Sequence, residues 1–431
     1  MNCCPVRVLA GALDAIDFFG DESLLPNPYP YFDRLRAQNP VVNLPHHDVV
    51  AVTGHEEAAV VYKDSGTFSS IVAVGGPFPP LPFEPRGDDI DEQIERYRDQ
   101  MPMSQYLTTM DPPEHSRMRF LLSRLLTPKR IQANEELLRR LADEQIDSFI
   151  DAGKCEFVSG YAKPFSSGVI AELLGIPVED RETFEAPRPH VPAGALDHAS
   201  IRHDSLEWLD DKFGHYLLDR RREPRADVLT RLANARYPDG DVPEIADVAR
   251  SATLVFTAAR GVTAILLTWA LRVLAERPDL VQQLRDDRSR LPNFIEELLR
   301  MESPVKSDFR LVRKTTTLGG VALPAGTTVM VCPGAVNRDP RKFEDPHEFR
   351  LNRPNVRDHV AFGRGAHFCP GAHVARAQGR VSIERILDRT TGIRLSAAKH
   401  GPARARRFHY EPTYTLRALS ELHLEFNPAP R

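Results

Sequence analysis

Few cysteines occur in this chain of 431 residues, and none of them stands in a pairing or metal-binding pattern. The five are dispersed and their number is odd: Cys3, Cys4, Cys155, Cys332 and Cys369. A disulfide framework uses an even set of cysteines, and a zinc ribbon uses paired C-x-x-C motifs. We therefore expect neither, and the cysteine usage is typical of a reducing cytoplasm.

Long hydrophobic runs are also missing, and so is an excess of charge of one sign. The most apolar stretch, 264–275, is short and contains Arg272, so we interpret it as a buried helix. The first 22 residues carry four acidic residues where a signal peptide requires an uninterrupted apolar segment. With 56 Lys and Arg against 60 Asp and Glu, the chain lacks the basic footprint of a nucleic-acid partner. These absences predict a cytoplasmic protein with no nucleic-acid and no membrane partner.

Helical periodicity dominates the middle of the chain, and the stretch 246–276 is apolar on nearly all sides, as in a helix through the centre of a large domain. Short segments between Gly and Pro turns predict strands near both ends of the sequence. The predicted helical parts are about 113–302 and 371–388, and the predicted β-rich parts are about 40–54, 305–355 and 408–426. Because the strands come from both ends, we predict one domain over 1–431, mainly α with a small β region.

The sharpest chemical signal is the segment from Phe362 to Gly371, FGRGAHFCPG, directly ahead of a predicted helix. Glycines let the backbone bend tightly and approach a flat ligand. A cysteine just before a helix N-terminus gains a dipole and free N–H groups that stabilise a thiolate. Such a thiolate is suited to be an axial ligand of haem iron. The alternative, an inert structural cysteine in a glycine turn, would not need so many specified positions.

This segment resembles the haem-binding loop F-G-x-G-x-H-x-C-x-G of the cytochromes P-450, and the resemblance extends from about residue 28 to 425. It implies the cytochrome P-450 fold, a single haem-thiolate domain that is mainly helical with a small β region. It implies haem b as cofactor, Cys369 as the axial ligand of the iron, and Phe362, Gly363 and Gly371 as cofactor-binding residues. The implied activity is monooxygenation of a small organic molecule, with electrons from ferredoxin and ferredoxin reductase.

Further positions match the family's other motifs. Glu297 and Arg300 form its E-x-x-R on one helix face, and Arg353 matches the third member of its buried Glu-Arg-Arg network. We interpret this network as a structural brace for the cysteine loop.

Four more residues match the family's partners of the haem propionates. His115 and Arg119 form its H-x-x-x-R, and at i and i+4 both can donate to one carboxylate. Arg310 and His367 are implied as two further propionate partners. The alternative is that all four are solvated surface side chains.

The central helix departs from the family pattern A/G-G-x-D/E-T-T, in which an acid and an alcohol relay protons. Counting back 17 residues from Pro278 aligns this pattern with 258–263. The acid position is then Gly261 and the alcohol position is Val262, and neither side chain can donate a proton. Thr263 lies one residue later, about 100° round the helix, and is predicted to be a poor substitute.

Three explanations for the missing pair stay open. The substrate supplies the hydroxyl or holds a water; or the enzyme uses peroxide or a haem reaction without O₂ cleavage, with Arg260 anchoring an acidic group; or the chain is a degenerate member that turns over poorly. The competing function classes are a haem-based binding or sensor protein and a structural or interaction protein. The complete cysteine loop argues against both.

Small side chains on one face of the central helix, Ala258, Ala259 and Val262, are predicted to form the oxygen and substrate pocket. The other candidates for this pocket are Phe78, Phe83, the loop 186–203, Val305, Lys306, Ser307, Asp308, Tyr414 and Thr415. Lys306 and Asp308 are charged where the family tends to be apolar, which favours a polar or zwitterionic substrate. Basic residues near the cysteine loop predict a docking face for a small acidic iron–sulfur protein: Arg124, Lys129, Arg130 and Arg364.

Overall fold

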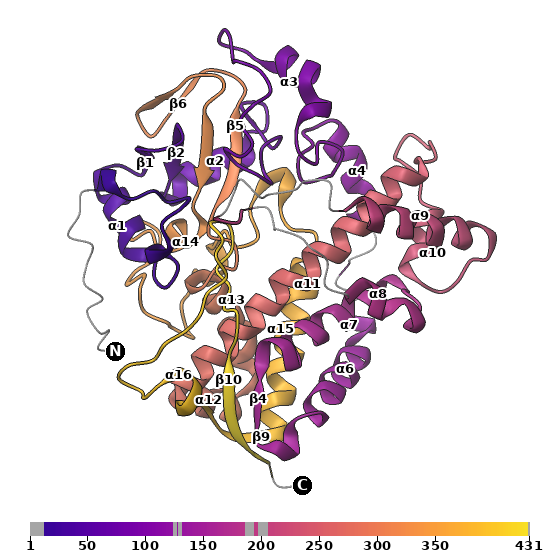
Figure 1. Ribbon diagram of the computed structural model, residues 1–431, viewed down its shortest axis with the longest axis vertical. Coiled ribbons are helices and arrows are strands. Elements are labelled where there is room, and N and C mark those ends of the chain that lie inside the picture. The colour runs from indigo at the N-terminus through magenta and orange to yellow at the C-terminus, as the bar shows by residue number, and fades with distance from the viewer. Residues whose placement is uncertain (1–12, 124–126, 128–131, 186–193, 197–205, 430–431) are drawn as a thin grey trace.

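Helices pack around one long central helix, and the strands gather in two places beside it (Figure 1). The computed structural model describes residues 13–123, 127, 132–185, 194–196 and 206–429. The helices are α1 (Tyr29–Gln38), α2 (His55–Lys63), α3 (Asp91–Tyr97), α4 (Glu114–Ser123), α6 (Glu135–Asp147), α7 (Lys163–Leu174), α8 (Arg181–Glu185), α9 (Glu207–Arg222), α10 (Val228–Ala233), α11 (Ile245–Glu276), α12 (Pro278–Asp286), α13 (Leu291–Met301), α14 (Pro333–Val336), α15 (Ala372–Arg389) and α16 (Ala397–His400). The strands are β1 (Val41–Asn43), β2 (Val49–Val52), β3 (Phe68–Ser69), β4 (Lys154–Glu156), β5 (Asp308–Val312), β6 (Thr316–Leu318), β7 (Val321–Leu323), β8 (Thr328–Val331), β9 (Thr390–Leu395) and β10 (His423–Pro428). The predicted class, mainly α with a small β region, is confirmed.

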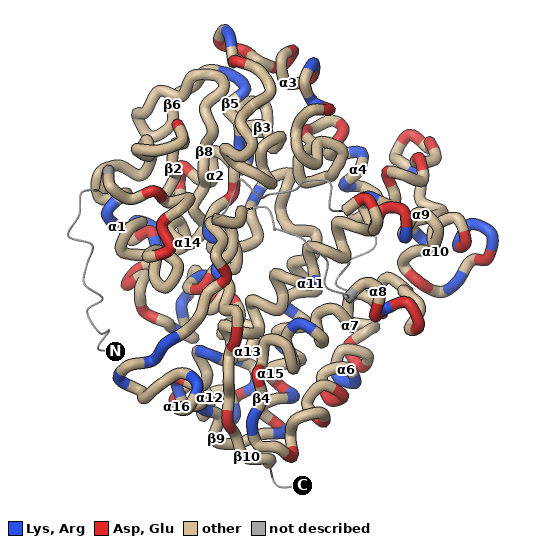
Figure 2. Tube along the Cα trace, in the orientation of Figure 1, with Lys and Arg blue, Asp and Glu red and all other residues tan. Residues whose placement is uncertain are grey.

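The central helix α11 runs for 32 residues, close to the predicted 246–276. It contains no proline, and Pro278 falls in the first turn of α12, where a missing N–H costs nothing. By length and composition α11 could span a membrane, but 61% of its most apolar window is buried inside the protein, as in a core helix. Charged residues lie on the outer elements, and the middle of α11 carries little charge (Figure 2).

Two apolar clusters flank α11 at its two ends. Val248, Ala252 and Phe256 belong to one cluster, with α7, α9 and α10, and 264–274 belongs to the other, with α13 and α15. Between these clusters, residues 258–262 are half-buried or exposed. This gap in the packing of α11 is where the candidate site lies.

Strands from both ends of the chain pair in the largest sheet, whose order is β1-β2-β8-β5-β3. β2 and β8 run parallel, with Val49 opposite Thr328, and β5 runs antiparallel to β8. All four residues of β2 are buried, as expected for a strand covered on both faces. The sheet places Asp308 and Arg310 of β5 in the wall of the cavity described below.

The predicted division into helical and β-rich parts was wrong in three places. β4 falls inside the predicted helical part 113–302, because β10 from the far end of the chain pairs with it. Within 408–422 there are only isolated bridges, and regular strand begins at His423. After β8, residues 337–355 form no strand, because the side chains of Arg300 and Arg353 bind the carbonyl groups of this stretch in place of a ladder.

Candidate active site

A cavity of about 520 Å³ lies between the middle of α11 and the cysteine loop. Its walls come from segments far apart in the sequence, because the loops before α4, before β5 and before α15 all end there. The predicted site residues that line it are His115, Arg119, Ala258, Ala259, Val262, Arg310, Phe362, Gly363, His367, Cys369 and Gly371.

The cysteine loop, residues 362–371, is held in a compact turn. The N–H of Cys369 donates to the carbonyl of Phe362 at 2.9 Å, and the N–H of Phe368 donates to Gly365 at 3.1 Å. Gly363 and Gly365 have φ of +65° and +67°, a region that L side chains rarely adopt. A Cβ on Gly365 would also come within 2.1 Å of the Tyr62 carbonyl oxygen at the end of α2. Glycine is therefore required there for the loop to pack against α2.

Cys369 lies on the wall of the cavity, where its sulfur is the candidate ligand for an iron. Burial raises the pKa of its thiol, and the N–H groups of Gly371 and Ala372 and the charges of Arg119 and Arg376 offset that rise only in part, so the thiolate needs a bound metal ion to stabilise it. Among the described residues, no group of three or more His, Cys, Asp or Glu side chains could hold a metal ion. A lone cysteine on a cavity wall fits an iron whose other ligands come from a prosthetic group.

Four nitrogen-bearing side chains, predicted as propionate partners, come together on one side of the cavity. The rings of His115 and His367 lie 4.0 Å apart between centroids. Arg310 is almost fully buried and donates to Asp308 at 2.9 Å and to the Phe309 carbonyl at 2.6 Å. Arg119 donates to the carbonyl of Phe368. The structure thus brings the four together around one space.

The histidines of this group carry buried nitrogens that have no hydrogen-bond partner among the described residues: Nδ1 and Nε2 of His115 and Nε2 of His367. Burial and the charges of nearby arginines lower the pKa of His115 to about 4 and that of His367 to about 3. Both imidazoles are therefore neutral at pH 7 and carry one N–H each; His367 is hydrogen-bonded to the backbone of Met110, so the donor without a partner among the described residues is that of His115. An unpartnered imidazole near the buried Arg310 and the half-buried Arg119 fits a ligand with carboxylates. The residues present thus fit haem.

The central helix presents small side chains to the cavity, as predicted. Ala258, Ala259 and Val262 all line it. Gly261 is exposed and does not line the cavity, and outside its own stretch of helix no atom of the described residues lies within 4 Å of the point where its Cβ would be, so none of these residues replaces the acid there. Arg260 is turned away from the lining, and its Nη1 donates to the Phe184 carbonyl at 3.0 Å. In this conformation Arg260 cannot anchor a substrate in the cavity.

Thr263 lines the cavity. The sequence predicted that it would point away, because it follows the alcohol position, Val262, by about 100° round the helix. The lining residues of α11 recur as 255, 258, 259, 262, 263 and 266, a broad face that includes both i+3 and i+4 positions. The hydroxyl groups of Thr257 and Thr268 donate to carbonyls one turn earlier, at 2.8 Å each. Within the described part of the chain, no such bond ties the hydroxyl of Thr263.

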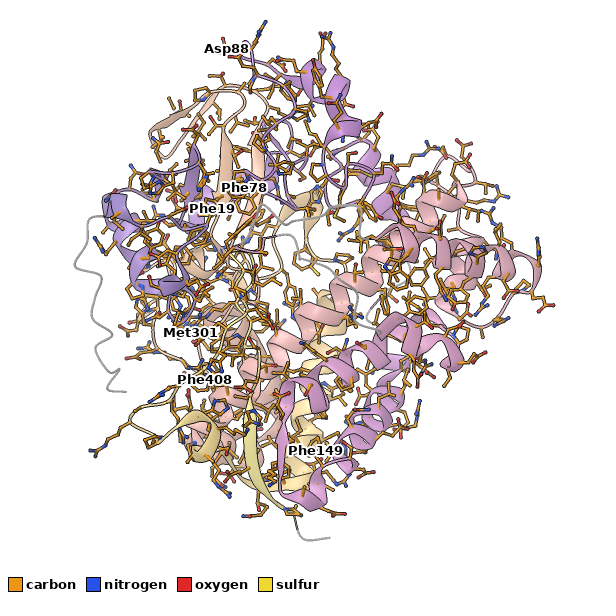
Figure 3. All side chains as sticks on the ribbon, in the orientation of Figure 1. Phe19, Phe78, Asp88, Phe149, Met301 and Phe408 are labelled. Atoms are coloured by element: carbon orange, nitrogen blue, oxygen red, sulfur yellow. The ribbon has the colours of Figure 1, made fainter. Side chains whose placement is uncertain are left out.

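Several pocket candidates do not reach the cavity. Phe78 packs on Phe19, with ring centroids 5.6 Å apart (Figure 3), and Phe83 stacks on Tyr97. The Tyr414 hydroxyl donates to the Gly75 carbonyl at 2.8 Å. Lys306 is buried outside the lining, where burial lowers its pKa to about 7. Those that do line the cavity are Val305, Ser307, Asp308 and Thr415.

Sequence reasoning missed other lining residues, above all Thr108, whose buried hydroxyl oxygen lacks a hydrogen-bond partner among the described residues. The H-x-x-x-R motif seven residues later could have pointed to the segment ahead of it. Tyr62 was missed as well, and most of the other missed side chains are apolar, among them Leu107, Leu122, Ile170, Leu254, Val255, Leu266 and Leu416. Most of the predicted loop 186–203 lies outside the described residues.

The buried Glu-Arg-Arg network forms as predicted. Arg300 donates to the Glu297 carboxylate from Nε at 2.7 Å and from Nη2 at 2.8 Å. Arg353 Nε lies 3.0 and 3.1 Å from the two oxygens of the same carboxylate. The exposed fractions are 0% for Glu297 and Arg300 and 4% for Arg353. Since the arginines also bind carbonyl groups of 337–348, the network fixes the chain that leads into the cysteine loop.

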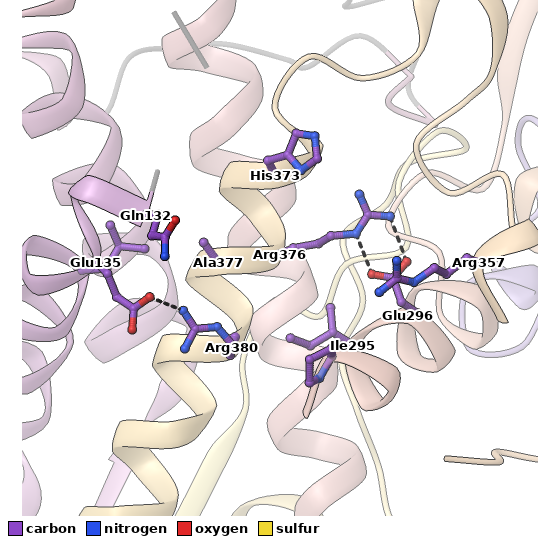
Figure 4. Close-up of a pocket in the computed structure, with 11 residues that line it drawn as sticks. Gln132, Glu135, Ile295, Glu296, Arg357, His373, Arg376, Ala377 and Arg380 are labelled. Atoms are coloured by element: carbon purple, nitrogen blue, oxygen red, sulfur yellow. Dashed lines mark hydrogen bonds and ion pairs between the residues drawn. The ribbon is translucent and has the colours of Figure 1, made fainter. Parts of the chain in front are cut away.

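The docking face can be placed only in part. Arg124, Lys129 and Arg130 lie outside the described residues, and Arg364 is half-buried, with its guanidinium donating to the Asp358 carbonyl. A groove beside the cysteine loop is lined by Arg357, His373, Arg376 and Arg380, together with Glu135 and Glu296 (Figure 4).

Comparisons with known proteins agree with the family resemblance of the cysteine loop. The family model "Cytochrome P450" matches residues 215–391. The chain is 33% identical to Cytochrome P450 144 of Mycobacterium tuberculosis over 89% of this chain and 87% of that protein. The structure of cytochrome P450 CYP150A6 from Mycobacterium marinum matches with a TM-score of 0.90 and 59% identity, over 97% of this chain and 100% of that one. CYP109E1 from Bacillus megaterium, in complex with testosterone, matches with a TM-score of 0.76 and 26% identity, over 93% and 99%.

Proposed function

Because the chain belongs to the cytochrome P450 family, whose members are haem-thiolate monooxygenases, we propose that it oxidises a small, mainly apolar molecule with electrons from a ferredoxin and its reductase. The observation that carries this proposal is one cavity lined by Cys369, by His115, Arg119, Arg310 and His367, and by the apolar side chains of α11. The free thiols of Cys155, Cys332 and Cys369 support the reducing cytoplasm as its location.

The bound haem b would supply the iron chemistry, namely electron transfer and the cleavage of O₂ favoured by a thiolate ligand. Cys369 would bind the iron, and Phe362, Gly363 and Gly371 would shape the loop that presents it. His115, Arg119, Arg310 and His367 hold the two propionates. Ala258, Ala259 and Val262 leave room for oxygen and substrate.

The lining supports a neutral substrate and not the polar or zwitterionic one that Lys306 and Asp308 favoured. Lys306 does not line the cavity, and Asp308 is paired with Arg310 at 2.9 Å. Away from the propionate side, the polar groups are the hydroxyls of Thr108, Thr263, Ser307 and Thr415. A mainly apolar molecule with one or two hydrogen-bonding groups suits this lining, a class that includes the testosterone bound by the Bacillus relative.

The enzyme proposal is tested by product formation from a screened ligand. Incubation with ferredoxin, ferredoxin reductase and NAD(P)H should yield oxidised product, whereas hydrogen peroxide alone should yield little. Product with peroxide alone would favour the peroxide-driven alternative. Ligand binding without product under either condition would favour the haem-based binding protein.

Proton delivery must avoid the two positions that lack a donor, Gly261 and Val262. We propose that a substrate hydroxyl or an ordered water replaces the missing pair, with the Thr263 hydroxyl as its contact on α11. This differs from the alternative in which Arg260 anchors an acidic group, since Arg260 is bound to the Phe184 carbonyl.

Substitution of Thr263 should uncouple electron use from product formation. General acid help of this kind is worth on the order of 10²–10⁴-fold in rate, so Thr263→Val should divert most reducing equivalents to released peroxide, and Val262→Thr in the same chain should restore product. Product and peroxide are measured per NAD(P)H consumed.

Thr257→Val is the matched control, because that hydroxyl is bound to a carbonyl of its own helix and is not part of the lining. Unchanged coupling in Thr263→Val would reject Thr263 as the contact. A loss of turnover in Arg260→Ala with unchanged coupling in Thr263→Val would favour the acid-anchor alternative.

Electron transfer should depend on the basic groove beside the cysteine loop (Figure 4). Arg357 is exposed, and so is Phe368 of the loop, at 41%. An acidic ferredoxin would be drawn to such a face, and exposed charges are screened within ~10 Å at 0.1 M salt. The rate of reduction by ferredoxin should therefore fall with rising salt and fall severalfold in Arg357→Glu.

The charge-matched control for this prediction is Arg86→Glu, ahead of α3 and away from α13 and α15 (Figure 1). Its reduction rate should equal that of the parent. A rate that is independent of salt, or equal losses in both variants, would contradict docking at this groove.

A further inference from the structure

Two consecutive acids on α13 are both buried: Glu296 is 2% exposed and Glu297 is 0% exposed. Adjacent helical residues point about 100° apart, so the two carboxylates have different neighbours. Glu297 binds Arg300 and Arg353, whereas Glu296 faces the groove beside the cysteine loop (Figure 4). The proposed function assigns Glu296 no role.

Arg376 of α15 donates two hydrogen bonds from its guanidinium to the Glu296 carboxylate. Nε donates to Oε1 at 2.6 Å, and Nη2 donates to Oε2 at 2.8 Å (Figure 4). His359 lies on the other side, with Nε2 3.1 Å from Oε2. Because His359 Nδ1 accepts the Ala361 N–H at 3.2 Å, the ring proton is on Nε2 and is donated to Glu296.

Glu296 is ionised in this setting. Burial alone would raise the pKa of its carboxyl, but the hydrogen bonds from Arg376 and His359 and the charge of Arg376 hold it at about 2. A buried carboxylate whose oxygens are all engaged by such partners is fixed in place.

The two partners of Glu296 stand on either side of the cysteine in the sequence. His359 comes three residues before Phe362, and Arg376 comes seven residues after Cys369. Phe362 links them, because its carbonyl accepts the Cys369 N–H at 2.9 Å and its ring centroid lies 4.5 Å from Arg376 Cζ. One carboxylate therefore holds both ends of the loop that carries the sulfur.

The same contacts place a positive charge near the sulfur and a negative charge against that positive charge. The Arg376 guanidinium acts on Cys369 from the start of α15, and the Glu296 carboxylate lies directly behind it and offsets its charge. Groups around a metal ligand tune the electron density that the ligand donates. A positive charge near the sulfur favours the reduced iron, and a negative charge favours the oxidised iron.

We propose that Glu296 and Arg376 are positioning residues that set the reduction potential of the haem by fixing the cysteine loop and the local field at Cys369. This inference rests on the proposed function, because it requires haem ligated by Cys369.

Opposite shifts in reduction potential are the test, measured by spectroelectrochemical titration of the haem-loaded full chain. Glu296→Gln keeps the shape and removes a negative charge, so the potential should become more positive. Arg376→Gln removes a positive charge, so the potential should become more negative. Arg376→Lys keeps the charge but loses the paired hydrogen bonds to the Glu296 carboxylate. Its reduction potential should stay close to that of the parent, while part of the ferrous–CO complex should lose the thiolate band.

Glu302→Gln is the matched control, because Glu302 is also a paired acid at the end of α13, bound by Arg417 at 2.7 Å and by Tyr29 at 2.8 Å. It does not line the cavity, and its potential should equal that of the parent. Shifts of the same sign in Glu296→Gln and Arg376→Gln, or no shift in either, would overturn the inference and leave the pair a structural brace.

Two outcomes separate this inference from the proposed function. A parent protein without a thiolate band would refute the proposed function itself. A parent with the band, whose potential does not respond to the Gln variants, would refute only the inference. Should Glu296→Gln fail to load haem, the Arg376 variants decide: a more negative potential in Arg376→Gln than in Arg376→Lys supports the inference, and equal potentials overturn it.

Discussion

Cys369→Ser should remove the strongly red-shifted Soret band of the ferrous–CO complex and abolish turnover. A serine hydroxyl does not ionise at neutral pH, so the iron would lose its anionic ligand and the electron density that favours O–O cleavage. At position 369, backbone N–H groups and arginines lower the pKa of the thiol, whereas burial raises it. In the serine variant these groups would act on a neutral hydroxyl. The measurement is the carbon monoxide difference spectrum of the reduced protein, with haem content determined separately.

Cys155→Ser is the control for this prediction. Cys155 is a free cysteine in β4, outside the cavity lining, and burial raises the pKa of its thiol to about 12, so it stays neutral. Its variant should keep the full band. If Cys369→Ser also kept the band, a different residue would have to be the ligand and the cysteine loop would be structural only.

Glu297→Ala should yield little haem-loaded protein. Removal of the carboxylate leaves Arg300 and Arg353 as two buried cations without a counter-charge, at exposed fractions of 0% and 4%. Breaking a buried ion pair from one side costs on the order of 3–5 kcal/mol. The chain 337–355, whose carbonyls both arginines bind, would lose its support together with the loop that follows it. Melting temperature and the ratio of haem to protein are the readouts.

Glu344→Ala provides the comparison in the same part of the chain. Its side chain is 86% exposed and lies 3.6 Å from Arg350, a surface pair worth less than about 1 kcal/mol. That variant should fold and load haem like the parent. A soluble, fully loaded Glu297→Ala protein with an unchanged melting temperature would contradict the role of the network.

Local spacing was enough to predict the residues whose chemistry depends on their neighbours in the chain. The cysteine loop, the E-x-x-R pair and the H-x-x-x-R pair each span at most ten residues, and turn or helix geometry alone places their side chains together. The long apolar stretch of α11 was predictable for the same reason, since a helix that is apolar all round has to be buried. These elements also carried the family resemblance and the expected fold class.

The composition of the pocket could not be read from the sequence in the same way. Phe78 and Phe83 were predicted to be pocket residues, but they pack against the rings of Phe19 and Tyr97 instead. Thr108 lines the cavity without standing in any motif. Whether a side chain lies in a cavity depends on every segment that packs around it, and those segments are hundreds of residues apart.

The sequence by itself determined what could be predicted of the cofactor chemistry: a cysteine in a glycine-rich loop before a helix, an E-x-x-R brace, and Gly261 and Val262 at the positions of an acid and an alcohol. Only the tertiary structure decided which side chains line the cavity. It turned Arg260 toward Phe184 and Thr263 toward the cavity, and it joined Glu296 to His359 and Arg376 across 63 and 80 residues. Hydrogen bonds and ion pairs at such separations form because the packing of whole helices brings their partners within 3 Å, and no local pattern in the chain encodes that approach.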